Sequence, residues 1–88
     1  KFNEFHNLVY EDGHLSKKLK KGLMGLACAI LAKCSWCIRS CIRDGIKEGV
    51  TKAEITEAVN IAMVMAAGAC WAHAGITMET ASTFGKKK

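Results

Sequence analysis

Apolar residues recur at helical spacing along most of the chain and divide it into several helices. Over residues 16–33, leucines and an isoleucine recur every three or four positions, which predicts a first helix capped by Ser16. A second helix is predicted over residues 35–47, because isoleucines and cysteines alternate with basic residues at the same period. Gly49 suits the left-handed conformation in which many helices end.

The clearest boundary in the chain is a capping box at Thr51 and Glu54, where each side chain can bond an unpaired N–H of a helix start. It predicts a third helix over residues 52–67. We expect a break at Gly68, and a fourth helix from there to about Ser82. An apolar lead-in, either a short helix or an arm, and a turn precede the four helices: residues 1–10 and 11–14. The pattern predicts one all-α domain, a small bundle of about four helices over residues 1–88.

The stretch from Ile61 to Ala72 is apolar on every side of its helix. A chain of 88 residues can hardly cover such a helix by itself, so we expect a second copy to cover it in a homo-oligomer. The apolar run is shorter than the roughly 20 residues of a membrane span. We therefore expect a soluble protein with no membrane partner.

Composition and charge narrow the picture further. The chain has no proline, which favours helices, and its five cysteines are an odd number for a secreted disulfide framework. We find no signal peptide and expect a reducing, cytoplasmic location. The net charge is +5, and its lysines are interpreted as a solvated first turn and a frayed tail: Lys17, Lys18, Lys20, Lys21, Lys86, Lys87 and Lys88. A basic row at Arg39, Arg43 and Lys47 has no interleaved aromatic residues, so no nucleic-acid partner is expected.

Candidate chemistry is concentrated in residues 34–41. Cys34, Cys37 and Cys41 recur at helical spacing and share one face of the second predicted helix. The helix start presents unpaired N–H groups and a positive dipole end, and both favour a thiolate. These three cysteines are therefore the candidate catalytic residues for thiol–disulfide exchange. Cys41 is either a third exchanging thiol or a core residue. Trp36 either controls access to the sulfurs or anchors the helix start, and we expect the anchor.

Other interpretations of the cysteines stay open. Free cysteines also pack as small apolar residues, and Cys28 and Cys70 are interpreted as core. Three thiolates can also hold zinc or an iron–sulfur cluster, with Cys28, Cys70 or His73 as a fourth ligand. A continuous helix lacks the second ligand group of ordinary zinc sites, so we expect no metal and no cofactor.

The C-x-x-C at the start of the second helix is followed by Asp44-Gly45-Ile46-Lys47-Glu48-Gly49-Val50-Thr51-Lys52-Ala53-Glu54-Ile55-Thr56-Glu57-Ala58. Together these segments resemble the carboxymuconolactone decarboxylase and AhpD-like (alkylhydroperoxidase) family. Similar residues occur upstream, at Val9-Tyr10, Gly13 and Leu15-Ser16, and the resemblance covers about residues 8–80.

The resemblance implies an all-α bundle that assembles into trimers or hexamers. It also implies a dithiol at Cys34 and Cys37 that reduces a peroxide or disulfide substrate and is regenerated by a thiol electron donor. The glutamate and histidine of the family's proton relay are absent, because Gly22 and Cys41 stand at their positions. His73 is the histidine best placed to replace the relay. The decarboxylase branch typically lacks the C-x-x-C, which disfavours lactone decarboxylation; a catalytically inert member is a further alternative.

Overall fold

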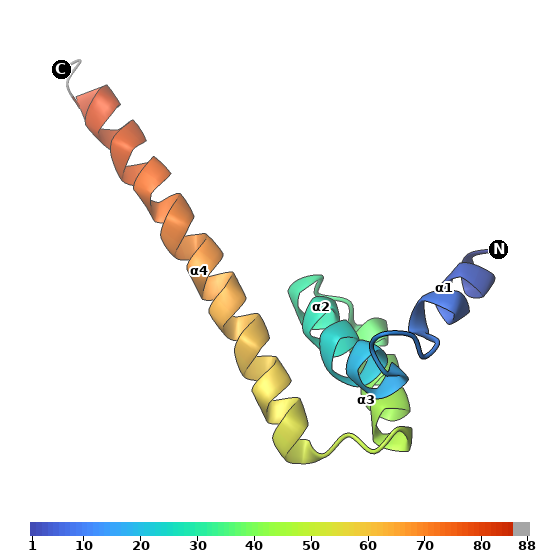
Figure 1. Ribbon diagram of the computed structural model, residues 1–88. Helices are drawn as coiled ribbons and strands as arrows, with labels where there is room; N and C mark the ends of the chain where they lie inside the picture. Colours follow the sequence, from blue (N-terminus) through green and yellow to red (C-terminus); the bar gives the residue numbers. More distant parts are fainter. Residues whose placement is uncertain (86–88) are drawn as a thin grey trace.

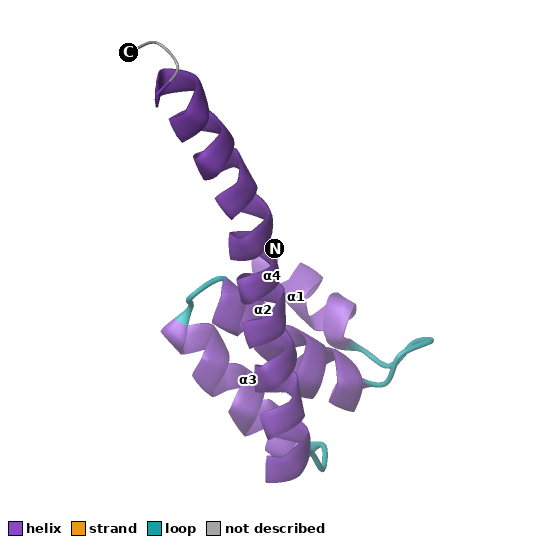
Figure 2. Cartoon of the chain, turned by 90° about the vertical axis from the view of Figure 1, so that its left-hand side faces the viewer, coloured by secondary structure: helices purple, strands orange, loops and turns teal. Residues whose placement is uncertain are grey.

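The computed structural model describes residues 1–85; the lysine tail at 86–88 lies outside the described residues. The described part of the chain consists of helices joined by short loops, with no strand (Figure 2). Its elements are α1 (Phe2–Tyr10), η1 (Lys18–Met24), α2 (Gly25–Leu31), α3 (Ser35–Lys47) and α4 (Lys52–Gly85). The all-α prediction is confirmed.

The predicted first helix is present, but it consists of a π-helical part followed by an α-helical part. Its first part, η1, is a π-helix, in which the N–H of Gly25 bonds back to the carbonyl of Lys20. The chain then continues without a break into α2. The lead-in is the short helix α1 rather than an extended arm, and α1 contains no buried residue.

The core lies where η1 and α2 pack against α3 and the first turns of α4. Leu26 is its centre, with 1% of its surface exposed, and the core residues around it are Cys41, Ala58, Leu23, Ile30, Ile38, Ile42 and Ile55. Gly22 and Gly45 let η1 and α3 approach closely. A Cβ on Gly45 would lie 2.8 Å from the Cα of Gly22, which is closer than such atoms can come.

The turn between α3 and α4 has the predicted chemistry. Gly49 has a φ of 93°, the left-handed conformation expected at a helix end. Thr51 donates its N–H to Oε1 of Glu54 at 2.9 Å, and Glu54 donates its N–H to the Thr51 hydroxyl at 3.2 Å. The predicted capping box is therefore confirmed, and it fixes the start of α4 at Lys52.

Replacing Glu54 with glutamine is expected to make stability less dependent on pH in the acid range. The hydrogen bond from the Thr51 N–H, aided by Lys18, lowers the pKa of Glu54 below its usual value. A lowered pKa contributes stability above the unfolded pKa, and this contribution disappears as the pH falls through the folded pKa. The measurement is the free energy of unfolding in urea at several pH values between 3 and 7 for both proteins. If this free energy changes with pH by the same amount in the two proteins, Glu54 does not have this role.

The predicted break at Gly68 is wrong, because α4 runs without interruption from Lys52 to Gly85. A single glycine costs a helix only about 1 kcal/mol, and alanines flank this one. Figure 1 shows α4 leaving the body of the chain after its first turns, so its second half meets no neighbouring element that would bend it.

Most of α4 is exposed in the single chain. Ala58 and Ala62 are its buried residues, whereas Met63, Val64 and Met65 are more than half exposed and Trp71 is 85% exposed. By length and composition alone, with a mean hydropathy of 1.5, this helix could cross a membrane. Core helices of soluble proteins share this length and composition but are mostly buried, whereas only 6% of the most apolar 18-residue window of α4 is buried. The unbroken helix is also longer than the apolar run on which the expectation of no membrane partner depended.

Candidate functional site

The two cysteines of the C-x-x-C form a disulfide at the start of α3. A left-handed turn at Lys33, with a φ of 58°, separates α2 from α3, and Cys34 follows as the N-cap residue. Its N–H donates to the carbonyl of Ala29 at 3.1 Å, and its Sγ accepts the N–H of Cys37 at 3.2 Å. The Cα atoms of Cys34 and Cys37 lie 5.2 Å apart, within the range that a disulfide spans.

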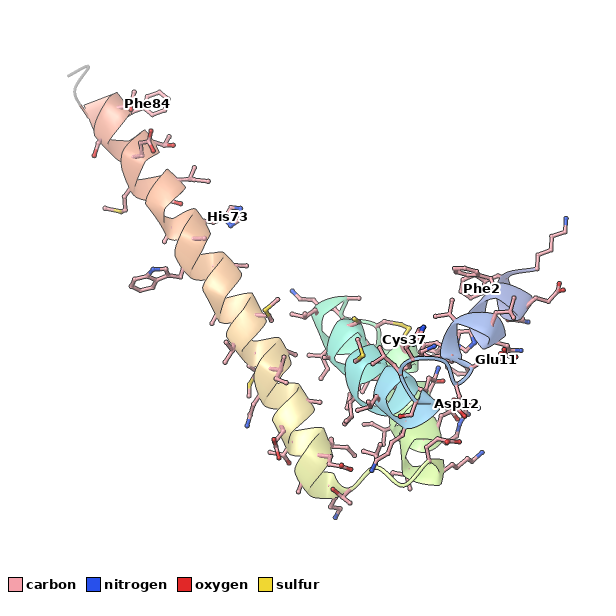
Figure 3. All side chains as sticks on the ribbon, viewed as in Figure 1. Phe2, Glu11, Asp12, Cys37, His73 and Phe84 are labelled. Atoms are coloured by element: carbon pink, nitrogen blue, oxygen red, sulfur yellow. A yellow bond between two sulfur atoms is a disulfide. The ribbon has the colours of Figure 1, made fainter. Side chains whose placement is uncertain are left out.

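A cavity of about 370 Å³ lies beside this disulfide. Figure 3 shows Cys37 on the side of the body that faces α1. The cavity lies between α1, the η1–α2 helix and α3, and its lining is Phe2, His6, Tyr10, Lys21, Gly25, Cys28, Ala29, Ala32, Trp36, Cys37, Ser40 and Cys41. Three of the five cysteines therefore share one cavity with a lysine, a histidine and a tyrosine.

Trp36 does not anchor the helix start, which corrects the prediction. Its side chain is 76% exposed and lines the cavity beside Cys37. Trp36 thus forms part of the entrance to the sulfur atoms.

Cys41 is a core residue, which is one of the two alternatives that the sequence left open, and it also lines the cavity. It is a free thiol, 3% exposed, and a Cβ on Gly25 would lie 3.4 Å from its Sγ. Burial raises the pKa of Cys41, Asp44 and Cys28 raise it further, and the positive charge of Lys21 opposes the shift. Cys41 is therefore protonated over a wider pH range than an ordinary cysteine.

The burial of Lys21 differs most from the interpretation of the sequence, which placed this lysine in a solvated first turn. It is only 4% exposed, and its Nζ donates to Nε2 of His6 at 3.3 Å and lies 3.8 Å from Oδ2 of Asp44. The same ammonium lies 4.6 Å from the centre of the Tyr10 ring, a cation–π contact. These partners compensate the buried charge, which stands beside the cavity that holds the thiols.

The aromatic side of the cavity comes from α1. Phe2, His6 and Tyr10 recur every four residues, and the His6 and Tyr10 rings lie 4.9 Å apart. Burial raises the pKa of Tyr10, and the neighbouring Cys41 and Cys28 add to the shift. The i, i+4 aromatic spacing was the signal that could have identified this lining.

Of the remaining candidate residues, Cys28 lines the cavity, whereas Cys70 and His73 lie on α4. Cys28 is exposed and lines the cavity, and Cys70 is exposed on α4, so neither is the core residue that was expected. Nδ1 of His73 donates to the carbonyl of Ala69, 2.8 Å away on the same helix, and Figure 3 shows His73 far along α4 from Cys37. Within residues 1–85, no three Cys, His, Asp or Glu side chains form a group that could hold a metal ion.

Replacing Lys21 with methionine is expected to slow the alkylation of Cys41 by iodoacetamide several-fold at pH 8. The substitution removes the charge that lowers the pKa of Cys41, so less thiolate is present at a given pH. Lys47→Met, at the exposed end of α3, the helix that carries Cys41, is the matched control. Equal rates in the two variants, both folded by circular dichroism, would show that Lys21 does not act on this thiol.

Comparison with known proteins places this geometry in context. A sequence model of the carboxymuconolactone decarboxylase family matches residues 1–77. A relative from Paracoccus denitrificans, named "Uncharacterized protein 4 in cox locus", is 38% identical over 73 residues. The match covers 83% of this chain but only 65% of that relative's length. The crystal structure of a Methanobacterium thermoautotrophicum protein, 27% identical, superposes with a TM-score of 0.78 over 88% of this chain and 87% of its own.

Proposed function

We propose that this chain, which belongs to the carboxymuconolactone decarboxylase family, is a thiol–disulfide oxidoreductase in which Cys34 and Cys37 cycle between dithiol and disulfide. The observation that carries the proposal is the bonded Cys34–Cys37 pair at a helix start, with Cys37 lining a cavity. A helix N-terminus stabilises the thiolate that exchange requires. Cys41, on the same cavity, is the third candidate thiol.

The proposed reaction reduces a peroxide or a disulfide. With a peroxide, the Cys37 thiolate attacks one oxygen, the O–O bond breaks, and water or an alcohol leaves, so that Cys37 becomes a sulfenic acid. The Cys34 thiol then attacks the Cys37 sulfur, a second water leaves and the disulfide forms. A thiol electron donor supplies two electrons and two protons in two exchange steps and restores the dithiol.

The site departs from the family's proton relay in a way that supports exchange by a different route. Gly22 and Cys41 stand at the relay positions, and both are buried against neighbouring helices. The charged and titratable groups beside the thiols are instead Lys21, His6 and Tyr10. A metal-bound function has less support, since no described group of side chains is arranged for it. Lactone decarboxylation is disfavoured because the C-x-x-C is present.

The proposed function includes a homo-oligomer, a trimer or hexamer, in the cytoplasm. The exposed apolar side chains of α4, among them Met63, Val64 and Trp71, form a larger apolar surface than a monomer keeps in water. Further copies of the chain would cover this surface. Light scattering coupled to gel filtration measures the particle mass, and a monomeric mass without detergent would contradict this part of the proposal.

The exchange reaction is tested by following each cysteine separately. Reduced protein is mixed with one equivalent of hydrogen peroxide or of glutathione disulfide, alkylated at intervals and digested with trypsin. Cleavage after Lys33, Arg39 and Arg43 isolates Cys34 and Cys37 on residues 34–39. We expect this peptide to be the first to lose both thiols, while Cys70 stays reduced. Equal oxidation of Cys70, which is exposed but lies outside the cavity, would contradict a dedicated dithiol.

A further inference from the structure

We infer that Cys28 and Cys41 form a second exchange pair, which takes over the disulfide from Cys34 and Cys37 across the shared cavity. The inference rests on the proposed function, because it requires that the first pair is reactive. The four sulfurs come from α2, α3 and the loop residue that caps α3, and Cys28, Cys37 and Cys41 line the same cavity. Sequence spacing showed only the three cysteines of residues 34–41 as a group.

The helices that carry the second pair run antiparallel. Gly22 lies against Gly45, and Gly25, one turn later, lies against the Sγ of Cys41, one turn earlier on α3. At the far end of the same contact, the Cys34 N–H donates to the carbonyl of Ala29. Along this series of contacts the residue numbers rise on the η1–α2 helix and fall on α3, so the two helices are antiparallel.

This register places Cys28 level with Cys37 along the helix axis, about one turn from Cys41. Cys28 follows Gly25 by three residues, so it shares the face of α2 that touches Cys41. One turn forward on α2 from the contact of Gly25 with Cys41 corresponds to one turn back on α3, from Cys41 to Cys37. The charge of Cys28 also raises the pKa of Cys41, which agrees with their proximity. Cys28 is exposed, whereas Cys41 is buried.

The transfer needs no outside oxidant or reductant. The Cys41 thiolate attacks Sγ of Cys37, a Cys41–Cys37 bond forms, and Cys34 leaves as a thiolate that takes up a proton. The Cys28 thiolate then attacks Sγ of Cys41, the Cys28–Cys41 bond forms, and Cys37 leaves and is protonated. Two protons move from the second pair to the first, and the number of disulfides stays at one. Lys21 lies beside this path and balances the charge of the Cys41 thiolate.

The consequence is that the disulfide moves to an exposed sulfur. Cys28 on the cavity rim can be reached by a donor thiol while Cys34 and Cys37 are again reduced and ready for substrate. The second pair would thus separate the step that uses the substrate from the step that uses the donor.

Trypsin distinguishes every pairing in this scheme. Cleavage after Lys21, Lys33, Arg39 and Arg43 places Cys28 on residues 22–33, both cysteines of the first pair on 34–39, and Cys41 on 40–43. A Cys34–Cys37 bond is then a loop within one peptide, and a Cys28–Cys41 bond joins residues 22–33 to 40–43. The experiment uses the full chain with Cys70→Ala, because Cys70 lies outside the cavity and can otherwise link two chains.

Reduced Cys70→Ala protein receives one equivalent of glutathione disulfide, and samples are acid-quenched, alkylated and mapped over time. We expect the loop in residues 34–39 to form first and then decline as the peptide joining 22–33 to 40–43 grows. A loop that forms while the joined peptide never appears would overturn the second pair and leave the proposed function standing. If the loop itself does not form in folded protein, the proposed function fails.

A second variant isolates the new pair. Cys34→Ser and Cys37→Ser, combined with Cys70→Ala, leave Cys28 and Cys41 as the two remaining thiols. We expect this protein to lose both thiols together in oxidised glutathione and to give the joined peptide. Two separate glutathione adducts on a folded protein would overturn the inference, because the sulfurs would then be unable to reach each other.

Discussion

A Cys37→Ser variant is expected to lose about 100-fold or more of its rate of peroxide or disulfide reduction. Serine keeps the size of the side chain, but its hydroxyl forms no nucleophile comparable to a thiolate at neutral pH. Cys37 lines the cavity and is bonded to Cys34, so its removal eliminates both the attacking sulfur and the disulfide. The measurement is the turnover rate with dithiothreitol as the donor and hydrogen peroxide as the oxidant.

Cys70→Ser is the matched control for this variant. Cys70 is a free, exposed thiol that lies on α4 and outside the cavity, so its replacement is expected to leave the rate within about twofold of the starting protein. Equal rates in Cys37→Ser and the unmodified chain would refute the assignment. Equal losses in the Cys37→Ser and Cys70→Ser variants would refute its specificity.

Replacing Gly45 with alanine is expected to destabilise the fold by about 1–3 kcal/mol. The added Cβ would lie 2.8 Å from the Cα of Gly22 and 3.4 Å from Val50, so η1 and α3 have to move apart. The Cα of Gly22 is a backbone atom, so it cannot avoid the new Cβ by a change of side-chain rotamer. The measurement is the urea midpoint at fixed protein concentration, because an oligomer's stability depends on concentration.

Gly68→Ala is the control, because it makes the same substitution at a position where the added methyl group has free space. Gly68 lies inside α4, and a Cβ there would meet no described atom within 4 Å. Alanine is a better helix former, so this variant is expected to gain about 0.5–1 kcal/mol. A Gly45→Ala protein as stable as Gly68→Ala would show that the close approach of η1 and α3 is not required.

Features set by neighbouring residues could be predicted from the sequence. The range of α3, the left-handed Gly49 and the capping box at Thr51 all depend on residues within one or two turns, and the structure has each of them. The C-x-x-C belongs to the same class, because its two cysteines are three residues apart at the start of α3. Local chemistry decided these features, so their identification needed no knowledge of the fold.

Features that depend on distant contacts could not be predicted. Lys21 looks like any lysine of a basic row, and only the packing of His6, Tyr10 and Asp44 around it shows that it is buried. Cys28 reaches the cavity through the register of α2 on α3, which its surroundings in the sequence do not reveal. Glycine disfavours helices, so the sequence predicts a break at Gly68. The alanines on both sides favour the helix, and α4 is unbroken at this position.

The reduction potential of the Cys34–Cys37 pair tests the central claim most directly. Full-length protein with Cys70→Ala is equilibrated in glutathione buffers of graded potential, alkylated, and scored by the fraction of residues 34–39 in the looped form. The account predicts a reversible two-electron transition between about −300 and −180 mV, the range of catalytic dithiols. A pair that stays oxidised well below about −300 mV would be a structural staple, and one that never closes in folded protein would have no exchange chemistry; either result contradicts the account.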